Sequence, residues 1–193
     1  MIDLNLLKEE DRLVISRINE KGRAWIVGGW VRDSLSGLIP TELDLATTLT
    51  PRDVQAIFPR SIMTGEKFGT TIVRIDDSEK ASYQCEVTTL RADGGYGDGR
   101  RPDNVVFGQE IEADLARRDF TINAMAVDGS GRLIDPFGGL DDLQEGLLRT
   151  VGSAEERISE DGLRILRAFR FMGPEGGDIR KMDVALMTAI SSN

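Results

Sequence analysis

The sequence predicts an α+β fold in two parts: a mixed sheet-and-helix domain over residues 1–140, then the start of an all-helical domain over residues 141–193. Three observations predict it. Short strand-like runs alternate with helical runs up to about residue 140, and only helical periodicity follows Ser153. With 40% hydrophobic residues, a chain of 193 residues can also bury a sizeable core without cross-links.

The individual elements follow from apolar periodicity and from helix start and stop signals. The predicted strands are short apolar or alternating runs at 24–27, 42–46, 70–75, 83–91 and 132–135. Predicted helices cover 3–21, 30–36, 110–126, 140–146 and 159–172, and another runs from Thr50-Pro51 to Pro59. Glycine and charge across 92–104 predict a mobile loop. Residues 173–193 are weakly patterned, so we expect the helical domain to be truncated.

Composition excludes several functional classes. Histidine is absent, which removes imidazole bases, Ser/His triads and histidine metal ligands, and one cysteine excludes a disulfide framework and a Cys-rich zinc site. No apolar run approaches the roughly 18 residues of a membrane span, and the N-terminus lacks a signal-peptide layout. We therefore expect a cytoplasmic protein with no membrane partner. The formal net charge of −9 predicts that any nucleic-acid contact uses local basic patches.

Carboxylates on two predicted strands are the first candidates for chemistry. Glu42 and Asp44 alternate with Leu43 and Leu45, so they share the polar face of their strand. Glu86 lies on the polar face of the strand over 83–91, and if these strands are neighbours, three carboxylates meet at one site. Such a set suits a hard divalent cation, because like charges so crowded need neutralising. The alternative is a solvated strand face.

Three further segments combine residue types that recognise nucleotides. Gly28 and Gly29 lie between a strand and a helix, where backbone N–H groups can approach a phosphate. In the following turn Arg32 could clamp phosphate oxygens and Asp33 could offset the helix dipole, although such a turn can also be purely structural.

The segment Arg117-Arg118-Asp119-Phe120-Thr121-Ile122-Asn123-Ala124 joins guanidinium donors, a carboxylate and an amide, which suits phosphate and ribose recognition or a capped helix start. In the helix over 159–172, Asp161 and Arg164 are i,i+3 neighbours that could read the pairing edge of a base, or form a surface ion pair. Arg167 and Arg170 continue that face, and we expect the apolar residues Leu163, Leu166 and Phe169 to form the packing side.

Together these segments resemble the bacterial tRNA nucleotidyltransferase and poly(A) polymerase family, class II of the polymerase-β-like nucleotidyltransferases. The resemblance covers about residues 24–171, in the family's order and spacing. Its motifs are Gly28-Gly29-Trp30-Val31-Arg32-Asp33, Glu42-Leu43-Asp44, Glu86-Val87-Thr88-Thr89-Leu90-Arg91, Arg117 to Ala124, Asp135-Pro136-Phe137-Gly138-Gly139-Leu140 and Glu160-Asp161-Gly162-Leu163-Arg164.

The resemblance implies a nucleotidyltransferase head followed by a helical neck, and a role for each motif. By resemblance, Glu42, Asp44 and Glu86 bind Mg²⁺. Gly28, Gly29 and Arg32, with Asp33 beside them, hold the triphosphate, and Arg117, Arg118, Asp119 and Asn123 hold ribose and phosphate. Asp161 and Arg164 act as a protein template for cytosine or adenine, and Arg167 and Arg170 line the same pocket. The implied reaction is attack of the tRNA 3′-hydroxyl on the α-phosphate of CTP or ATP, which releases pyrophosphate. The 92–104 segment matches the family's flexible loop.

Two features depart from the family pattern. The family normally has aspartate where this chain has Glu42, and the extra methylene moves the carboxylate by about 1.5 Å. We expect an altered metal geometry. Family members are also much longer, so we expect this chain to bind nucleotide but to add it poorly to tRNA.

The leading hypothesis is Mg²⁺-dependent CCA addition to the tRNA 3′ end. Residues 65–70 resemble the CCA-adding version of that loop more than the poly(A) polymerase version. A poly(A) polymerase, a C-only or A-only adding enzyme, and a non-catalytic nucleotide- or RNA-binding module stay open. A small-molecule nucleotidyltransferase is disfavoured, because the template pair would have no purpose there.

Overall fold

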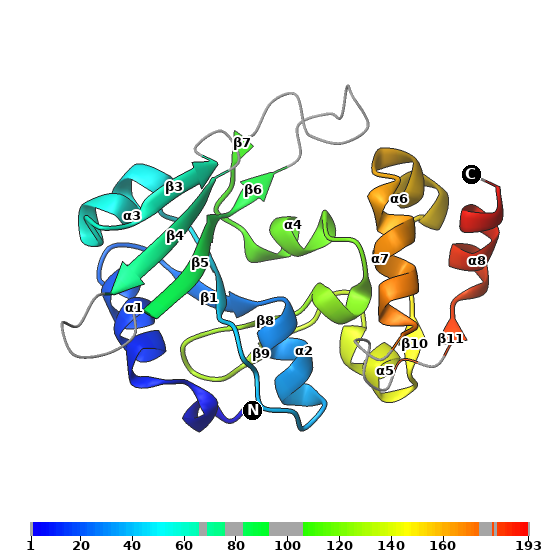
Figure 1. Cartoon of the computed structure of the whole chain (residues 1–193), viewed down its shortest axis with the longest axis horizontal. Helices are drawn as coiled ribbons and strands as arrows, with labels where there is room; N and C mark the ends of the chain where they lie inside the picture. Colours follow the sequence, from blue (N-terminus) through cyan, green and yellow to red (C-terminus); the bar gives the residue numbers. More distant parts are fainter. Residues whose placement is uncertain are drawn as a thin grey trace.

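A seven-stranded mixed sheet is the centre of the first part of the molecule (Figure 1). The computed structural model describes residues 2–65, 69–75, 83–92, 106–173, 179 and 181–192. The strand order is β3-β4-β5-β2-β1-β8-β9, and only the β2–β5 pair is parallel. The strands are β1 (Ala24–Val27), β2 (Asp44–Thr47), β3 (Ile62–Gly65), β4 (Thr70–Ile75), β5 (Tyr83–Thr89), β8 (Ala126–Val127) and β9 (Leu133–Ile134). The predicted α+β class is therefore confirmed.

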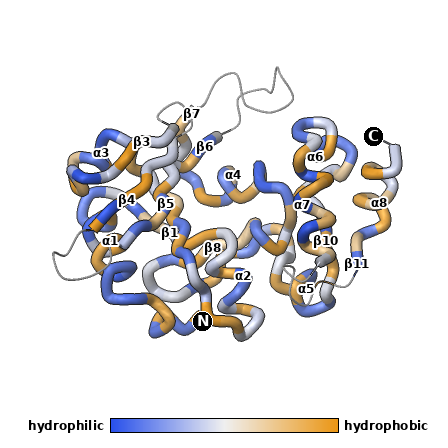
Figure 2. The backbone as a smooth tube through the Cα atoms, viewed as in Figure 1, coloured by the Kyte–Doolittle hydropathy of each residue, from blue (hydrophilic) through white to orange (hydrophobic). Residues whose placement is uncertain are grey.

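Helices cover both faces of this sheet. On one face α1 (Glu9–Asn19) and α3 (Pro51–Ile57) contribute Ile18 and Val54 to a core that includes Leu45 and Val87. On the other face α4 (Ile111–Ala116) packs Leu115 in a second cluster with β1. Figure 2 shows apolar colouring along β1, whose four residues are all buried. The short elements η1 (Leu4–Leu6), α2 (Gly29–Leu35), β6 (Arg91–Ala92), β7 (Val106–Phe107) and η3 (Thr121–Asn123) complete this part.

The second part consists mostly of helices, which lie to the right of the sheet in Figure 1. Its elements are α5 (Gly139–Gln144), β10 (Leu147–Leu148), α6 (Ala154–Glu160), α7 (Leu163–Phe171), β11 (Lys181–Met182) and α8 (Val184–Ser191). Strands β10 and β11 form a parallel pair, so the prediction of helix alone after Ser153 is wrong for β11. The division of the chain at residue 140 stays a prediction. In the described part of the chain no helix has both the length and the apolarity to span a bilayer.

The predicted helix over 110–126 is wrong beyond Ala116. From there the backbone bonds to a distant segment instead of to itself: the Thr121 N–H donates to the Arg149 carbonyl, and the Val151 N–H donates to the Asp119 carbonyl, at 3.0 Å each. These bonds anchor 117–123, which is irregular up to Phe120 and forms the short 3-10 helix η3 at Thr121–Asn123. The predicted helix over 159–172 is likewise interrupted, because Asp161 is extended and separates α6 from α7.

Candidate active site

The turn between β1 and α2 lies directly against two charged side chains. Gly28 has a φ of +67°, a conformation that favours glycine. A Cβ placed on Gly28 would lie 3.5 Å from both Asp44 Oδ2 and Arg118 Nη1, and one on Gly29 would lie 3.5 Å from Arg32 Nη2. The turn, a carboxylate and two guanidinium groups therefore converge on one place, and any larger side chain at the turn would intrude on it.

Two of the three predicted carboxylates face each other across neighbouring strands. Asp44 of β2 and Glu86 of β5 are register partners in the parallel pair, and Leu45 and Val87 beside them point into the core. The two acidic side chains therefore share the opposite face. The prediction that these strands are neighbours is confirmed.

The prediction that Glu42 lies on this strand is wrong, because β2 begins only at Asp44. Strand β1 ends at Val27, the register partner of Asp44, so the chain before Asp44 has no β1 residue to pair with. Glu42 is exposed. Among the described residues no group of three or more cysteine or acidic side chains is gathered closely enough to hold a metal ion, so the third predicted ligand is not in place.

The electrostatic environment of Asp44 disfavours its charged form. Burial raises the pKa of Asp44 above its ordinary value, and repulsion from Glu86 and Glu42 adds to the increase, while Arg118 opposes it. Asp44 is thus a carboxylate whose negative charge is poorly compensated by the protein. A divalent cation at Asp44 and Glu86 would relieve this repulsion, so the donor set fits a hard, oxygen-preferring metal.

Arg32 is held by three side chains from three elements. Its Nε and Nη2 donate to Asp33 Oδ1 at 2.9 and 2.7 Å, and its Nη1 donates to Asn123 Oδ1 at 2.8 Å. The guanidinium carbon also lies 5.4 Å from the centre of the Phe171 ring in α7. These contacts from Asp33, Asn123 and Phe171 fix the orientation of the Arg32 guanidinium beside the glycine turn.

Asp114 organises the two arginines that follow α4, a role that the sequence reasoning missed. Its buried carboxylate forms an ion pair with Arg117 and accepts from Arg118 Nη2 at 3.3 Å. Arg118 Nη1 also donates to the Asn123 carbonyl at 3.2 Å. The i,i+3 and i,i+4 spacing of Asp114 to Arg117 and Arg118 was the available signal.

Asp119 joins this segment to α7. Its Oδ1 accepts from the N–H of Phe120, and its Oδ2 accepts from Nε and Nη2 of Arg167, both at 2.7 Å. The Asp119 side chain is buried, whereas the Arg167 side chain is 56% exposed. Two predicted nucleotide-binding residues are therefore paired with each other.

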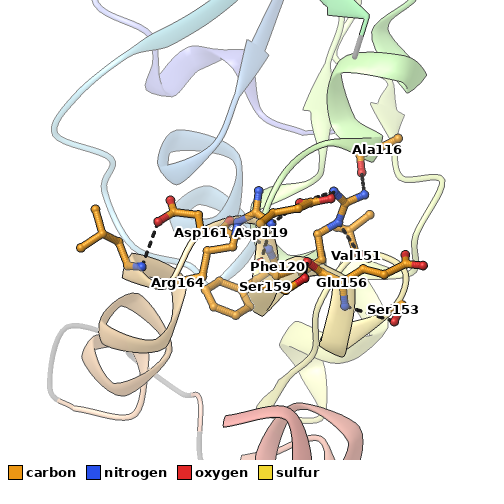
Figure 3. A network of polar contacts seen from close by, with 12 residues as sticks. Ala116, Asp119, Phe120, Val151, Ser153, Glu156, Ser159, Asp161 and Arg164 are labelled. Carbon is orange, nitrogen blue, oxygen red and sulfur yellow. Dashed lines mark hydrogen bonds and ion pairs between the residues drawn. The ribbon is translucent and has the colours of Figure 1, made fainter. Parts of the chain in front are cut away.

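Asp161 and Arg164 do not form the predicted side-chain pair. Asp161 Oδ1 accepts from the N–H of Leu163 and so caps the start of α7. Arg164 instead donates to Glu160 Oε2 at 2.6 Å and to the Arg157 carbonyl at 2.8 Å. Figure 3 shows Arg164 within this polar network, with Asp161 to one side. The break between α6 and α7 frees Asp161 for capping and aligns Arg164 with Glu160 one turn earlier.

The predicted packing side of α7 is also wrong. Leu163, Leu166 and Phe169 are 51%, 67% and 57% exposed, whereas Arg164 and Ala168 are buried. The helix carries apolar residues on more than one face, so their spacing alone could not select the buried one. Arg170 is exposed on the same helix. Of the predicted loop over 92–104, Ala92 belongs to β6 and residues 93–104 lie outside the described residues, as do residues 66–68 of the 65–70 loop.

Comparison with known proteins gives consistent matches. The family model described as "Poly A polymerase head domain" matches residues 24–149. The CCA-adding enzyme of Geobacillus thermodenitrificans is 48% identical over 164 residues, which are 84% of this chain and 39% of that protein.

Two solved structures are also similar to this chain. The Bacillus stearothermophilus CCA-adding enzyme in complex with CTP has a TM-score of 0.83 and 38% identity, over 97% of this chain and 44% of that one. The Thermotoga maritima CCA-adding enzyme complexed with tRNA-CCA has a TM-score of 0.71 and 26% identity, over 98% of this chain and 44% of that one. The chain therefore spans less than half the length of the proteins it matches.

Proposed function

The chain belongs to the poly(A) polymerase head-domain family, and from that premise we propose that it performs the nucleotide transfer of a CCA-adding enzyme. In this proposal the tRNA 3′-hydroxyl attacks the α-phosphate of CTP or ATP, CMP or AMP joins the RNA, and pyrophosphate leaves. The CCA-adding enzymes similar to this chain, among them proteins in complex with CTP and with tRNA-CCA, support this choice of substrates.

One observation carries the proposal: Asp44 and Glu86 are register partners directly beside the glycine turn and Arg118. Carboxylates and phosphate-binding groups are thereby placed within reach of a single nucleotide. A strand face that served only solubility would not bring a poorly compensated carboxylate against a positive-φ glycine and a guanidinium.

We assign Asp44 and Glu86 as ligands of Mg²⁺, with Glu42 as the candidate third ligand. Bound there, the ion would neutralise phosphate charge and activate the attacking oxygen. Oxygen donors without histidine or thiolate favour Mg²⁺ over softer metals. The crowding that raises the pKa of Asp44 supports a cation at this position.

The other side chains bind and orient the nucleotide in this proposal. Gly28 and Gly29 let the triphosphate approach the backbone, and Arg32 and Arg118 supply fixed guanidinium donors. Asp119 and Asn123 lie where the ribose would follow, each already holding one arginine. Asp161 and Arg164 would read the base, which requires Arg164 to leave Glu160 and turn to the nucleotide. Arg167 and Arg170 would line the same pocket from α7.

A cytoplasmic location belongs to the same proposal. The substrates are intracellular nucleotides and tRNA, and the single cysteine, Cys85, is buried and unpaired. Burial raises the pKa of its thiol to about 12, so the thiol stays protonated and needs no oxidising compartment.

A non-catalytic nucleotide- or RNA-binding module is the second candidate. It is favoured by Glu42, which replaces the family's aspartate and lies outside the strand. The two candidates differ in whether a phosphodiester bond forms.

The deciding experiment supplies labelled CTP, ATP or both, with Mg²⁺, to tRNA that ends at the discriminator base, and sizes the products. We expect slow label transfer that needs both Mg²⁺ and Asp44, with Asp44→Asn as the matched inactive variant. Addition of two C residues from CTP alone and completion to CCA with ATP would identify the specificity, whereas a long A tract would indicate a poly(A) polymerase. Binding of CTP without any label transfer would support the non-catalytic module and contradict the proposal.

A further inference from the structure

Phe171 of α7 covers one face of the Arg32 guanidinium in α2. The guanidinium carbon is 5.4 Å from the ring centre, a distance at which the π face attracts a cation. The edges of the same guanidinium are bonded to Asp33 and Asn123. Arg32 therefore has its plane set by a ring from the helical part and its edges set by groups from the sheet part.

The position of Phe171 is supported by one contact of its ring and by an ion pair elsewhere on α7. It meets the buried ring of Phe120 edge-on, with the ring centres 5.6 Å apart and an interplanar angle of 79°. One turn earlier on α7, Arg167 forms its ion pair with Asp119, which directly precedes Phe120. The Arg32 side chain is only 18% exposed, so little water competes for its contacts. The stack is thus part of a packed junction and not a chance surface contact.

We infer that Phe171 is a positioning residue for the triphosphate, acting through Arg32. This inference rests on the proposed function, in which Arg32 binds phosphate. Three N–H groups of the guanidinium donate hydrogen bonds to Asp33 and Asn123. The ring over its face sets the orientation of the guanidinium plane, so that the remaining N–H groups lie beside the glycine turn. Without the ring, the guanidinium can tilt away from the direction in which a phosphate would approach.

The same contact links phosphate binding to the base-reading helix. Arg164 lies two turns before Phe171 on α7, so a triphosphate that fixes Arg32 also favours one position of α7 through the ring. This link predicts that Phe171 matters for nucleotides that carry the phosphates of CTP and not for the cytidine moiety alone.

The test measures the affinities of the 193-residue chain for CTP and for CMP, with Mg²⁺, by titration calorimetry. Phe171→Leu keeps an apolar side chain but removes the π face, and we expect CTP to bind about 5- to 30-fold more weakly, the range of a desolvated cation–π contact. Affinity for CMP should change by less than about 2-fold, so the CTP-to-CMP affinity ratio falls. Phe171→Tyr retains the ring and should bind CTP like the wild type.

Phe169→Leu is the matched control, because it makes the same change two residues away on an exposed side chain. It should leave both affinities unchanged. If Phe171→Leu does not fold, as judged by its melting curve without nucleotide, Phe171→Met fills the same space without a π face and replaces it.

Two further outcomes separate this inference from the proposed function. Equal CTP affinity in Phe171→Leu and Phe169→Leu, or an equal loss for CTP and CMP, would overturn the positioning role while leaving the proposed function intact. No CTP binding by the wild-type chain would overturn both. In the Arg32→Gln background the Phe171→Leu change should cause no further loss, since the cation it acts on is gone, and a full additional loss there would contradict the inference.

Discussion

The acidic pair on the central strands β2 and β5 and the junction between α6, α7 and the sheet differ in how their charges are compensated. At the acidic pair, Asp44 lies beside Glu86 and near Glu42, and its pKa is raised by burial and by this repulsion. At the junction two carboxylates each have an arginine: the buried Asp119 pairs with Arg167, and the half-buried Glu160 pairs with Arg164. Both regions are rich in charge, but only the junction is compensated by the protein itself.

This difference indicates what each region is for. A group held with uncompensated charge costs stability and is retained when a ligand supplies the missing charge. We therefore expect the acidic pair Asp44 and Glu86 to act as a binding site, and the junction to act as a structural connection. Substitutions should accordingly have opposite effects on stability and binding in the two regions.

The largest expected effect follows from Asp44→Asn. Losing a metal-binding carboxylate should reduce label transfer about 1000-fold, since metal stabilisation of the transition state is worth several kcal/mol and each 1.36 kcal/mol is a factor of ten. The melting temperature at pH 7 should rise. Because the folded pKa is raised, protonated Asp44 contributes its full stabilisation below about pH 3.8. This contribution is lost as the pH rises through the folded pKa, so at pH 7 it is absent.

Asp128→Asn is the control for this pair of measurements. Burial raises the pKa of Asp128, but hydrogen bonds from Ser130 and Arg132 outweigh burial and keep that pKa below its ordinary value. The neutral variant should therefore lose stability and keep its transfer rate. An Asp44→Asn protein that is both less stable and fully active would show that Asp44 has a structural role.

A smaller effect is expected from Glu42→Asp, which restores the family's residue. If Glu42 is a misplaced third ligand, shortening it by about 1.5 Å should raise turnover, by up to about 100-fold. The measurement is the rate of label transfer from CTP at saturating Mg²⁺, with Glu42→Gln as the variant of unchanged length. An unchanged or lower rate in Glu42→Asp would count against an altered metal geometry.

The paired carboxylates could be predicted from the sequence, but the position of Glu42 could not. The alternation of polar and apolar residues fixes which side chains share a strand face, and it correctly placed Asp44 with Glu86. Where a strand begins depends on its partner, and β2 begins where β1 ends in the glycine turn. The first residue of β2 is therefore set by its tertiary pairing with β1, and the local sequence pattern does not indicate that pairing.

The junction was predicted less well for a related physical reason. Its arginines were predicted to bind nucleotide, which stays a prediction, and their protein partners are distant in sequence or shared, as in the contact of Arg167 with Asp119. The local pattern of 117–123 predicts α-helix, but backbone bonds to Arg149 and Val151 hold the segment in a path with only the short 3-10 helix η3. Long-range hydrogen bonds overrode helical periodicity there, and the sequence offered no signal for them.

Glu160→Gln tests whether the ion pair of Glu160 with Arg164 at the junction stabilises the fold. Arg164 is buried and would keep its charge without a carboxylate, so we expect a loss of about 2 kcal/mol in the free energy of unfolding, between the values for exposed and buried pairs. Burial raises the pKa of Glu160, but hydrogen bonds from Arg164 and Arg157 outweigh burial and lower that pKa below its ordinary value. The contribution of Glu160 is therefore complete above about pH 4.5 and is lost as the pH falls through its folded pKa.

Urea unfolding at pH 7 and at pH 3.5 measures this effect, with Glu155→Gln on the exposed side of the same helix as the control. The difference between wild type and Glu160→Gln should shrink at the lower pH, while CTP binding at pH 7 should weaken little. A variant as stable as the wild type at pH 7 would contradict a structural role for this pair.

The smallest effect is expected for the link between Asp119 and Arg167. Asparagine at 119 retains an oxygen that accepts from the Phe120 N–H but loses the charge that pairs with Arg167. Because the Arg167 side chain is 56% exposed, the coupling should be only about 1 kcal/mol. A double-mutant cycle with Asp119→Asn and Arg167→Gln, followed by urea unfolding, isolates it. A coupling near zero would mean that α7 is held in place by the edge-to-face contact of the Phe120 and Phe171 rings and not by charge. A coupling well above 2 kcal/mol would make Arg167 a structural residue, with little freedom to turn toward a nucleotide.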